Sequence, residues 1–151
     1  MKNHSREGIK NIAGFTLLEV FIVASLLVLL SSTGINHLNS YREHMLLRLS
    51  AQAFSGELNR ARAASIACGV PVEIRLSRDR RTYNLRLKYA GTDFARFTLP
   101  GSLEFTSEPS RPIVFYNSGT CAPSGSYVIA SDKLSVKVVV SIMGRVRWEF
   151  L

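Results

Sequence analysis

Hydrophobic positions follow two different periods along this chain of 151 residues, and the change falls near residue 69. The first apolar run, 15–30, is interrupted only by Thr16, Glu19 and Ser25. A helix rises about 1.5 Å per residue, so 15–35 would span about 31 Å. That length matches the ~30 Å hydrocarbon core of a bilayer. We therefore predict a membrane-spanning helix over 15–35.

The helical period continues beyond this run. Apolar and small residues recur at alternating spacings of four and three, which places them on one face of an amphipathic helix. They are Leu47, Ala51, Phe54, Leu58, Ala61, Ser65 and Cys68. Gly69 and Pro71 end the pattern. We predict one long helix from about Phe15 to Ala67, in which 15–35 faces lipid or neighbouring subunits and 36–68 packs on a domain.

After residue 69 apolar and polar residues alternate, which is typical of β-strands. The runs 70–76 and 83–89 flank the basic segment 77–82 and predict a hairpin with a basic tip. Further strands are expected at 94–99, 103–106, 112–116, 126–130, 134–142 and 146–150. A long helix followed by short antiparallel strands is an α+β arrangement.

Two connections in this predicted β domain, 69–151, stand out. The strands 134–142 and 146–150 are joined by Met143-Gly144-Arg145, where Gly144 is expected to supply a positive φ. The segment 117–125 is rich in Gly, Ser and Pro and is predicted to be a loop.

The leader, residues 1–14, has three Lys or Arg and one Glu, a net charge of +2. A positive flank favours the cytoplasmic side, which leaves the C-terminal domain outside. A secretory signal should end in small residues of the Ala-x-Ala kind, and Ser31-Ser32-Thr33-Gly34 matches that only roughly. A permanent anchor explains everything except Glu19, because a carboxylate in hydrocarbon costs roughly a few kcal/mol and usually has a partner.

Composition adds a charge balance and two cysteines. The net charge of +8 suggests an anionic partner or a solvated basic surface. Outside the membrane a disulfide between Cys68 and Cys121 is permitted; the alternative is one buried thiol and one loop thiol. No metal, cofactor or enzyme site is predicted, since no Cys pair has zinc spacing and no phosphate loop or nucleophile motif occurs.

The segment Gly14-Phe15-Thr16-Leu17-Leu18-Glu19, with its basic leader and apolar run, resembles the processing site of type IV pilins and pseudopilins. The resemblance implies cleavage between Gly14 and Phe15 by a prepilin peptidase and N-methylation of Phe15. Glu19 could then neutralise the Phe15 amine of the preceding subunit in a filament and set axial register. The alternative is that Glu19 pairs with its own N-terminus.

Most of the chain is similar to the FimT/GspH family of minor pilins and pseudopilins. The segments that carry this likeness are 58–66, 113–119 and Gly144-Arg145-Val146-Arg147. In FimT-like proteins a Gly-Arg-x-Arg motif is implicated in DNA uptake. The resemblance therefore implies that Arg145 and Arg147 contact DNA, with Gly144 as turn former. Arg78, Arg80 and Arg81 could extend this surface, or all these arginines could simply be solvated.

Two functions remain open from sequence. The first is a minor type IV pilin, which sits in the bacterial inner membrane with its C-terminal domain in the periplasm, enters a pilus and binds double-stranded DNA for natural transformation. The second is a GspH-type minor pseudopilin of a type II secretion system, with a structural role and no DNA binding. An assembly-priming minor pilin lies between them. All have other pilins or pseudopilins as partners.

Overall fold

The computed structural model describes residues 16–151, except the side chains of 31–39. The predicted leader and the cleavage and methylation residues, Gly14 and Phe15, lie outside the described residues. The chain divides into two units, one up to Asn39 and one from Ser40 to Leu151. A single helix, α1 (Leu17–Cys68), belongs to both and agrees with the predicted bounds to within two residues.

In the first unit α1 begins at a side-chain cap. The Thr16 hydroxyl accepts a hydrogen bond of 3.2 Å from the Glu19 backbone N–H, and Thr-x-x-Glu is the sequence pattern of a capping box. From Leu17 to Leu30 the large apolar side chains are 49% to 89% exposed. Within the part of the chain that the structure describes, no helix combines the length and hydropathy required to cross a membrane.

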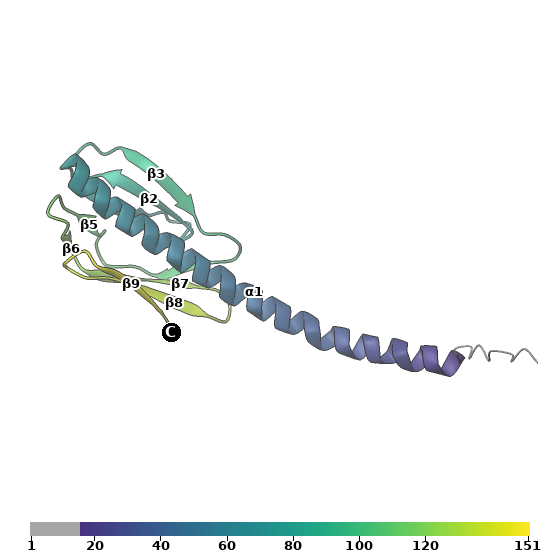
Figure 1. The fold of residues 1–151 in the computed structure, drawn as a ribbon. Coiled ribbons are helices and arrows are strands. Elements are labelled where there is room, and N and C mark those ends of the chain that lie inside the picture. Colours follow the sequence, from purple (N-terminus) through teal and green to yellow (C-terminus); the bar gives the residue numbers. More distant parts are fainter. Residues whose placement is uncertain (1–15) are drawn as a thin grey trace, which may run out of the picture. The chain divides into compact units, whose positions relative to one another are not determined.

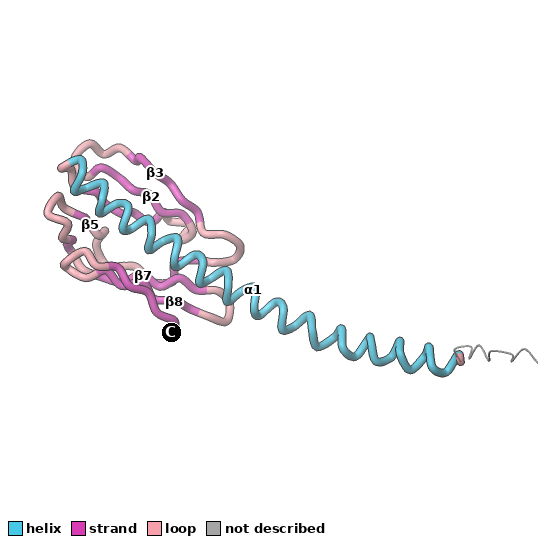
Figure 2. The backbone as a smooth tube through the Cα atoms, viewed as in Figure 1, coloured by secondary structure: helices cyan, strands magenta, loops and turns pink. Residues whose placement is uncertain are grey.

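The second unit contains two antiparallel sheets (Figures 1 and 2). The five-stranded sheet has the order β3-β2-β1-β5-β6 and the four-stranded sheet the order β4-β7-β8-β9. The strands are β1 (Val72–Leu76), β2 (Thr82–Leu87), β3 (Asp93–Thr98), β4 (Glu104–Ser107), β5 (Val114–Phe115), β6 (Cys121–Ala122), β7 (Gly125–Ala130), β8 (Ser135–Val140) and β9 (Val146–Phe150). The predicted α+β fold is confirmed.

The core of this unit lies between the second half of α1 and the inner faces of both sheets. Phe54 is at its centre, with ring centroids 4.8 Å from Tyr83 and 5.1 Å from both Phe105 and Tyr127. The predicted helix face is fully buried from Leu47 to Ala61. Because these core side chains all come from Ser40–Leu151, this unit contains its own hydrophobic core.

Two predictions about the strands need correction. The segment 117–125 is not entirely a loop, because Cys121 and Ala122 form β6 and pair with Phe115 and Val114. A two-residue strand is too short to produce an alternating pattern. The predicted strand 134–142 ends at Val140, since the chain turns from Ser141 onward.

Both cysteines are free thiols, so the permitted disulfide is not formed in this structure. Cys68 is the last residue of α1 and is exposed, whereas Cys121 is buried. The Cys121 thiol donates to the Ser141 carbonyl oxygen at 3.0 Å. Burial raises the pKa of the Cys121 thiol.

Candidate nucleic-acid interface

The turn between β8 and β9 presents the predicted Gly-Arg-Val-Arg motif. The Ser141 N–H donates to the Arg145 carbonyl at 3.0 Å, and the Gly144 N–H donates to the Ser141 carbonyl at 2.8 Å. Gly144 has φ of +72°, as expected from the sequence. This is a three-residue hairpin loop with glycine in the left-handed position, a common way to join antiparallel strands.

Gly144 is also packed against the rest of the domain. A Cβ atom placed on Gly144 would collide with the Gly119 carbonyl oxygen and lie 2.8 Å from Arg62 Nε. Arg62 Nε itself donates to the Gly119 carbonyl at 2.8 Å. Glycine is therefore required here for close approach as well as for backbone conformation. Sequence reasoning assigned only the second of these roles.

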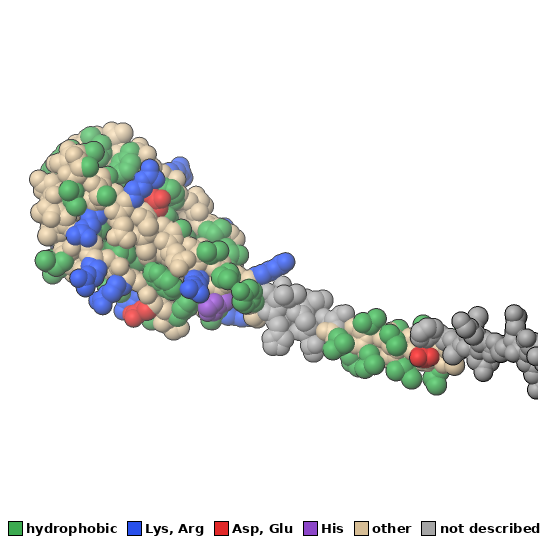
Figure 3. Space-filling view, viewed as in Figure 1, with side chains coloured by type: hydrophobic (Ala, Val, Ile, Leu, Met, Phe, Trp, Pro, Cys, Tyr) green, Lys and Arg blue, Asp and Glu red, His purple; other side chains and the backbone are tan. Residues whose placement is uncertain are grey.

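Arg145 and Arg147 are both exposed, while the intervening Val146 is half-buried. This alternation directs the two arginines to the outer face of the four-stranded sheet. Across the ladder, Arg147 is opposite Val139 and Glu149 is opposite Lys137. The outer face of β8–β9 therefore has three cations and one carboxylate. Figure 3 shows Lys and Arg side chains gathered along the edge of the domain where β8 and β9 lie.

Two surface hollows lie beside these cations. One, of about 550 Å³, is lined by Ser124, Gly125, Ser126, Lys137, Val139, Val140, Ser141, Ile142 and Met143. A smaller one, of about 190 Å³, is lined by Val139, Arg147, Trp148 and Glu149. Val139 therefore separates a hollow on the β7 side from one on the β9 side. Ammonium, guanidinium and hydroxyl groups along such a surface are suitable donors to phosphate oxygens.

The second predicted basic group, at the β1–β2 tip, does not join this face. Tyr83, next to that tip, packs on Phe54, whereas the β8–β9 turn lies against Arg62. Eight helical residues separate these two contacts, about 12 Å along the axis of α1. Figure 1 shows the start of β2 and the β8–β9 turn at opposite ends of the domain. Arg78, Arg80 and Arg81 therefore form a basic group separate from the Arg145 surface.

Two charged residues near the β1–β2 tip, Asp79 and Arg81, make hydrogen bonds to nearby groups. Asp79 accepts from the backbone N–H of Arg81 and of Thr82 and from the Thr82 hydroxyl, at 3.0, 3.0 and 2.7 Å. These bonds, led by the one from Arg81, lower the pKa of Asp79. The Arg81 guanidinium also donates to the Gly101 carbonyl. Thus Asp79 and Arg81 stabilise the turn.

Other cations of the stretch 75–88 have acidic partners on neighbouring positions. Arg75 is 2.9 Å from Glu73, and Arg86 is 3.7 Å from Asp93. These contacts favour the solvated-face interpretation of this stretch.

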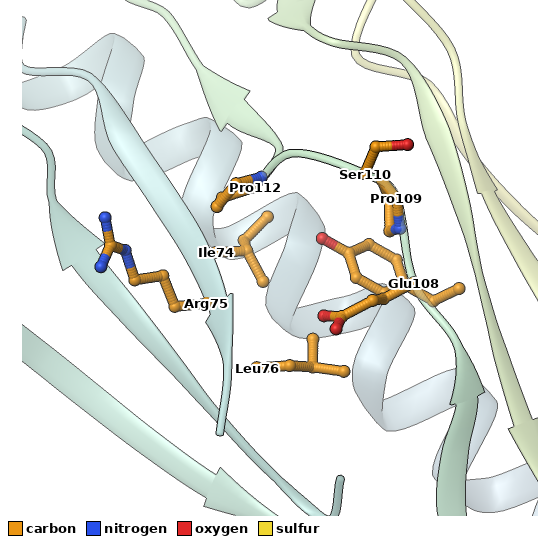
Figure 4. Close-up of a pocket in the computed structure, with 8 residues that line it drawn as sticks. Ile74, Arg75, Leu76, Glu108, Pro109, Ser110 and Pro112 are labelled. Atoms are coloured by element: carbon orange, nitrogen blue, oxygen red, sulfur yellow. The ribbon is translucent and has the colours of Figure 1, made fainter. Parts of the chain in front are cut away.

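Another cavity, of about 350 Å³, lies between β1 and the segment before β5 (Figure 4). Ile74 and Leu76 form one side and Pro112 closes it, whereas the Arg75 side chain is directed to the other side of β1. Glu108 and Tyr127 are its other titratable groups, and burial raises the pKa of the Tyr127 phenol. Figure 4 shows the Ser110 hydroxyl directed away from the Glu108 carboxylate.

The fold resembles solved structures of two kinds. The minor pseudopilin EpsH from the type 2 secretion system of Vibrio cholerae matches with a TM-score of 0.57 and 18% identity, over 69% of this chain and 96% of that chain. The type IV minor pilin FimU of Pseudomonas aeruginosa matches with a TM-score of 0.61 and 15% identity, over 72% of this chain and 92% of that one. This is the fold of minor pilins and pseudopilins. No protein-family model and no curated protein matches the sequence.

The predicted site residues belong to different elements of this fold. Glu19 lies in the first turn of α1, and the Gly144–Arg147 motif lies at the hairpin that begins β9. Lys137 and Arg62 were not predicted as part of the motif's surroundings. The alternation along β8 could have placed Lys137 on the outer face, but no local pattern indicates that Arg62 contacts residue 119.

Proposed function

We propose that this protein is a minor pilin of a type IV pilus that binds double-stranded DNA through the outer face of β8 and β9. The observation that carries the proposal is the pair of exposed arginines, Arg145 and Arg147, joined on that face by Lys137. Guanidinium groups bind phosphate oxygens in a bidentate manner without reading sequence. Such contacts suit a protein that captures any DNA.

The proposal includes the route by which the protein reaches the pilus. Prepilin peptidase would cleave after Gly14, and the apolar start of α1 would hold the protein in the inner membrane before assembly. The exposed apolar side chains from Leu17 to Leu30 support this, because apolar surface of such extent is usually covered by lipid or protein. Other pilins would cover it in the filament.

The second candidate is a minor pseudopilin of a type II secretion system. The likeness to EpsH, which covers 96% of that chain, favours it. In that role the partners would be other pseudopilins, and the arginines of β9 would be solvated. Only the pilin candidate is expected to bind DNA, so a DNA-binding assay distinguishes the two candidates.

The test uses the unit Ser40–Leu151, which contains the whole described core, and a fluorescently labelled duplex of 20 base pairs. Binding is followed by fluorescence anisotropy at several salt concentrations. We expect Arg145→Ala plus Arg147→Ala to weaken binding and to reduce the salt slope by about 2, one counterion for each lost phosphate contact. Arg78→Ala plus Arg80→Ala removes the same charge from the opposite end of the domain and is the matched control.

Equal binding by wild type and the Arg145/Arg147 variant would remove the motif from the proposal. Absence of binding by the wild type at low salt would favour the pseudopilin candidate.

A further inference from the structure

The β8–β9 turn exposes two apolar side chains between the cations. Ile142 is 64% exposed and Met143 is 71% exposed, and both line the hollow that contains Lys137. Neither side chain belongs to the hydrophobic core. They lie in the turn that carries Arg145 and beside the hollow that Lys137 lines, which indicates a role in contact with the bound partner.

Backbone hydrogen bonds and close packing fix the turn that carries Ile142 and Met143. The Ile142 carbonyl accepts a hydrogen bond of 2.9 Å from the Cys121 N–H, and the Arg145 N–H donates to the Ser141 hydroxyl at 3.2 Å. Gly144 is buried against Arg62 and Gly119. Because the backbone on both sides of Ile142 and Met143 is bonded to β6, α1 or the turn itself, the two side chains project from a supported base.

Donor groups lie on both sides of the apex. On the β9 side they are Arg145 and Arg147, and on the β7 side they are Ser124 and Ser126, while Lys137 of β8 lies between the two sides. Strands β7 and β9 are separated only by β8, so they are about 10 Å apart. The two flanks can therefore face the two phosphate backbones that border one groove, with Ile142 and Met143 between them.

We propose that Ile142 and Met143 form an apolar wedge that enters the minor groove and partly unstacks a base step while the flanking cations hold the phosphates. This inference rests on the proposed DNA binding and specifies its mode. Proteins that unstack DNA use Ile and Met, among other apolar side chains, for this purpose, and unstacking costs less at flexible or mismatched steps. The protein therefore prefers DNA that is already weakly stacked.

The test compares Ser40–Leu151 with its Ile142→Ser plus Met143→Ser variant on two duplexes of equal length, one fully paired and one with a central mismatch. A 2-aminopurine base beside the centre of each duplex reports unstacking by increased fluorescence. We expect wild type to bind the mismatched duplex more tightly and to raise the 2-aminopurine signal. The variant should lose about tenfold in affinity for the mismatched duplex, because the burial of two apolar side chains is largely offset by the cost of unstacking, and give no signal.

Controls separate this inference from the proposed function. Arg145→Ala plus Arg147→Ala should weaken binding to both duplexes and reduce the salt slope, whereas the serine variant should keep that slope. Tyr89→Ser removes another side chain that is 77% exposed and should change nothing. Matching thermal unfolding of all variants, followed by circular dichroism, shows that they fold.

Three results would overturn the wedge. If wild type binds DNA but shows no mismatch preference and no 2-aminopurine change, the arginines bind without a wedge. If the serine variant loses binding to vesicles containing phosphatidylglycerol but keeps all DNA binding, the apex is a lipid contact. If wild type does not bind either duplex, the proposed function fails and the wedge with it.

Discussion

Arg62 Nε donates a hydrogen bond of 2.8 Å to the carbonyl oxygen of Gly119, and Gly144 packs against both groups. This contact joins the last turns of α1, the loop before β6 and the turn before β9. Ser65, one turn further along α1, donates from its hydroxyl to the Tyr116 carbonyl at 3.0 Å. The position of the Arg145–Arg147 surface therefore depends on the C-terminal end of the helix.

Replacing Arg62 tests this dependence. Arg62→Ala should lower the free energy of unfolding by about 2 kcal/mol, because the Gly119 carbonyl loses a charged donor in a partly buried place. Urea unfolding of Ser40–Leu151, followed by the fluorescence of Trp148, measures it. Arg60→Ala is the control, since its contact with Glu57 is 3.6 Å long and Arg60 is 65% exposed. An equal loss in both variants would contradict the assigned role.

Gly144→Ala tests the close approach at the same place. We expect a loss of about 2–4 kcal/mol, from the strained positive φ together with the collision with Gly119 and Arg62. Gly69→Ala has a similar φ, +67°, but no atom lies within 4 Å of its added Cβ. It should therefore lose only about 1 kcal/mol, the cost of a left-handed backbone for a residue with a Cβ. The same urea experiment measures both variants, and equal losses would show that the packing contributes nothing.

The comparison between these glycines also shows what the sequence can reveal. The end of α1 was predictable because Gly69 and Pro71 stop a long helical period, and the positive φ of Gly144 because it follows an alternating strand. The contact of Gly144 with residue 119 was not, because it joins segments that have no common local pattern. For the same reason the location of the two basic groups at opposite ends of the domain required the structure.

Strand β6 and the helix cap were missed for different reasons. Cys121 and Ala122 pair with β5 over two residues, which is too short for any period to be seen. The Thr16-x-x-Glu19 cap has a recognisable sequence pattern, but a single carboxylate in an apolar run equally predicts an ion pair. The observed cap bond uses the backbone N–H of Glu19, so it leaves the carboxylate available for the predicted role in assembly.

The two thiols should react very differently in the folded protein. Cys68 is exposed and should be alkylated readily, whereas Cys121 is buried, and its raised pKa keeps the reactive thiolate scarce. Mass spectrometry should find one label per native chain and two after unfolding in urea. Cys68→Ser should take up no label when folded. Labelling of neither cysteine until a reductant is added would show that the disulfide forms.

Because of Asp79, the free energy of unfolding should decrease at low pH. Its pKa in the folded state lies below the usual value of 3.8, so its stabilising contribution is present above that pH and is lost as pH falls through the lowered pKa. Asp79→Asn should destabilise the domain at neutral pH and flatten the dependence of unfolding on pH below 4. Asp132→Asn, at an exposed position between β7 and β8, is the control. An unchanged acid profile in Asp79→Asn would contradict this.

Glu19 allows its two roles to be separated by a matched pair of variants. Glu19→Gln keeps a side chain suited to a capping box but removes the charge, and Glu19→Ala removes both. If the carboxylate neutralises the Phe15 amine of a neighbouring subunit, both variants should be cleaved after Gly14 and remain in the membrane, yet both should be missing from sheared filaments. Immunoblots of the membrane and filament fractions, with the processed mass as a check, measure this.

Ser25→Ala is the control for these variants, because the Ser25 hydroxyl is already bonded to the Ile22 carbonyl of its own helix at 2.8 Å. It should enter filaments normally. Normal incorporation of Glu19→Gln together with failure of Glu19→Ala would refute the pairing of charges. It would show that assembly requires a polar side chain at position 19 and not its charge, since a neutral amide would then suffice.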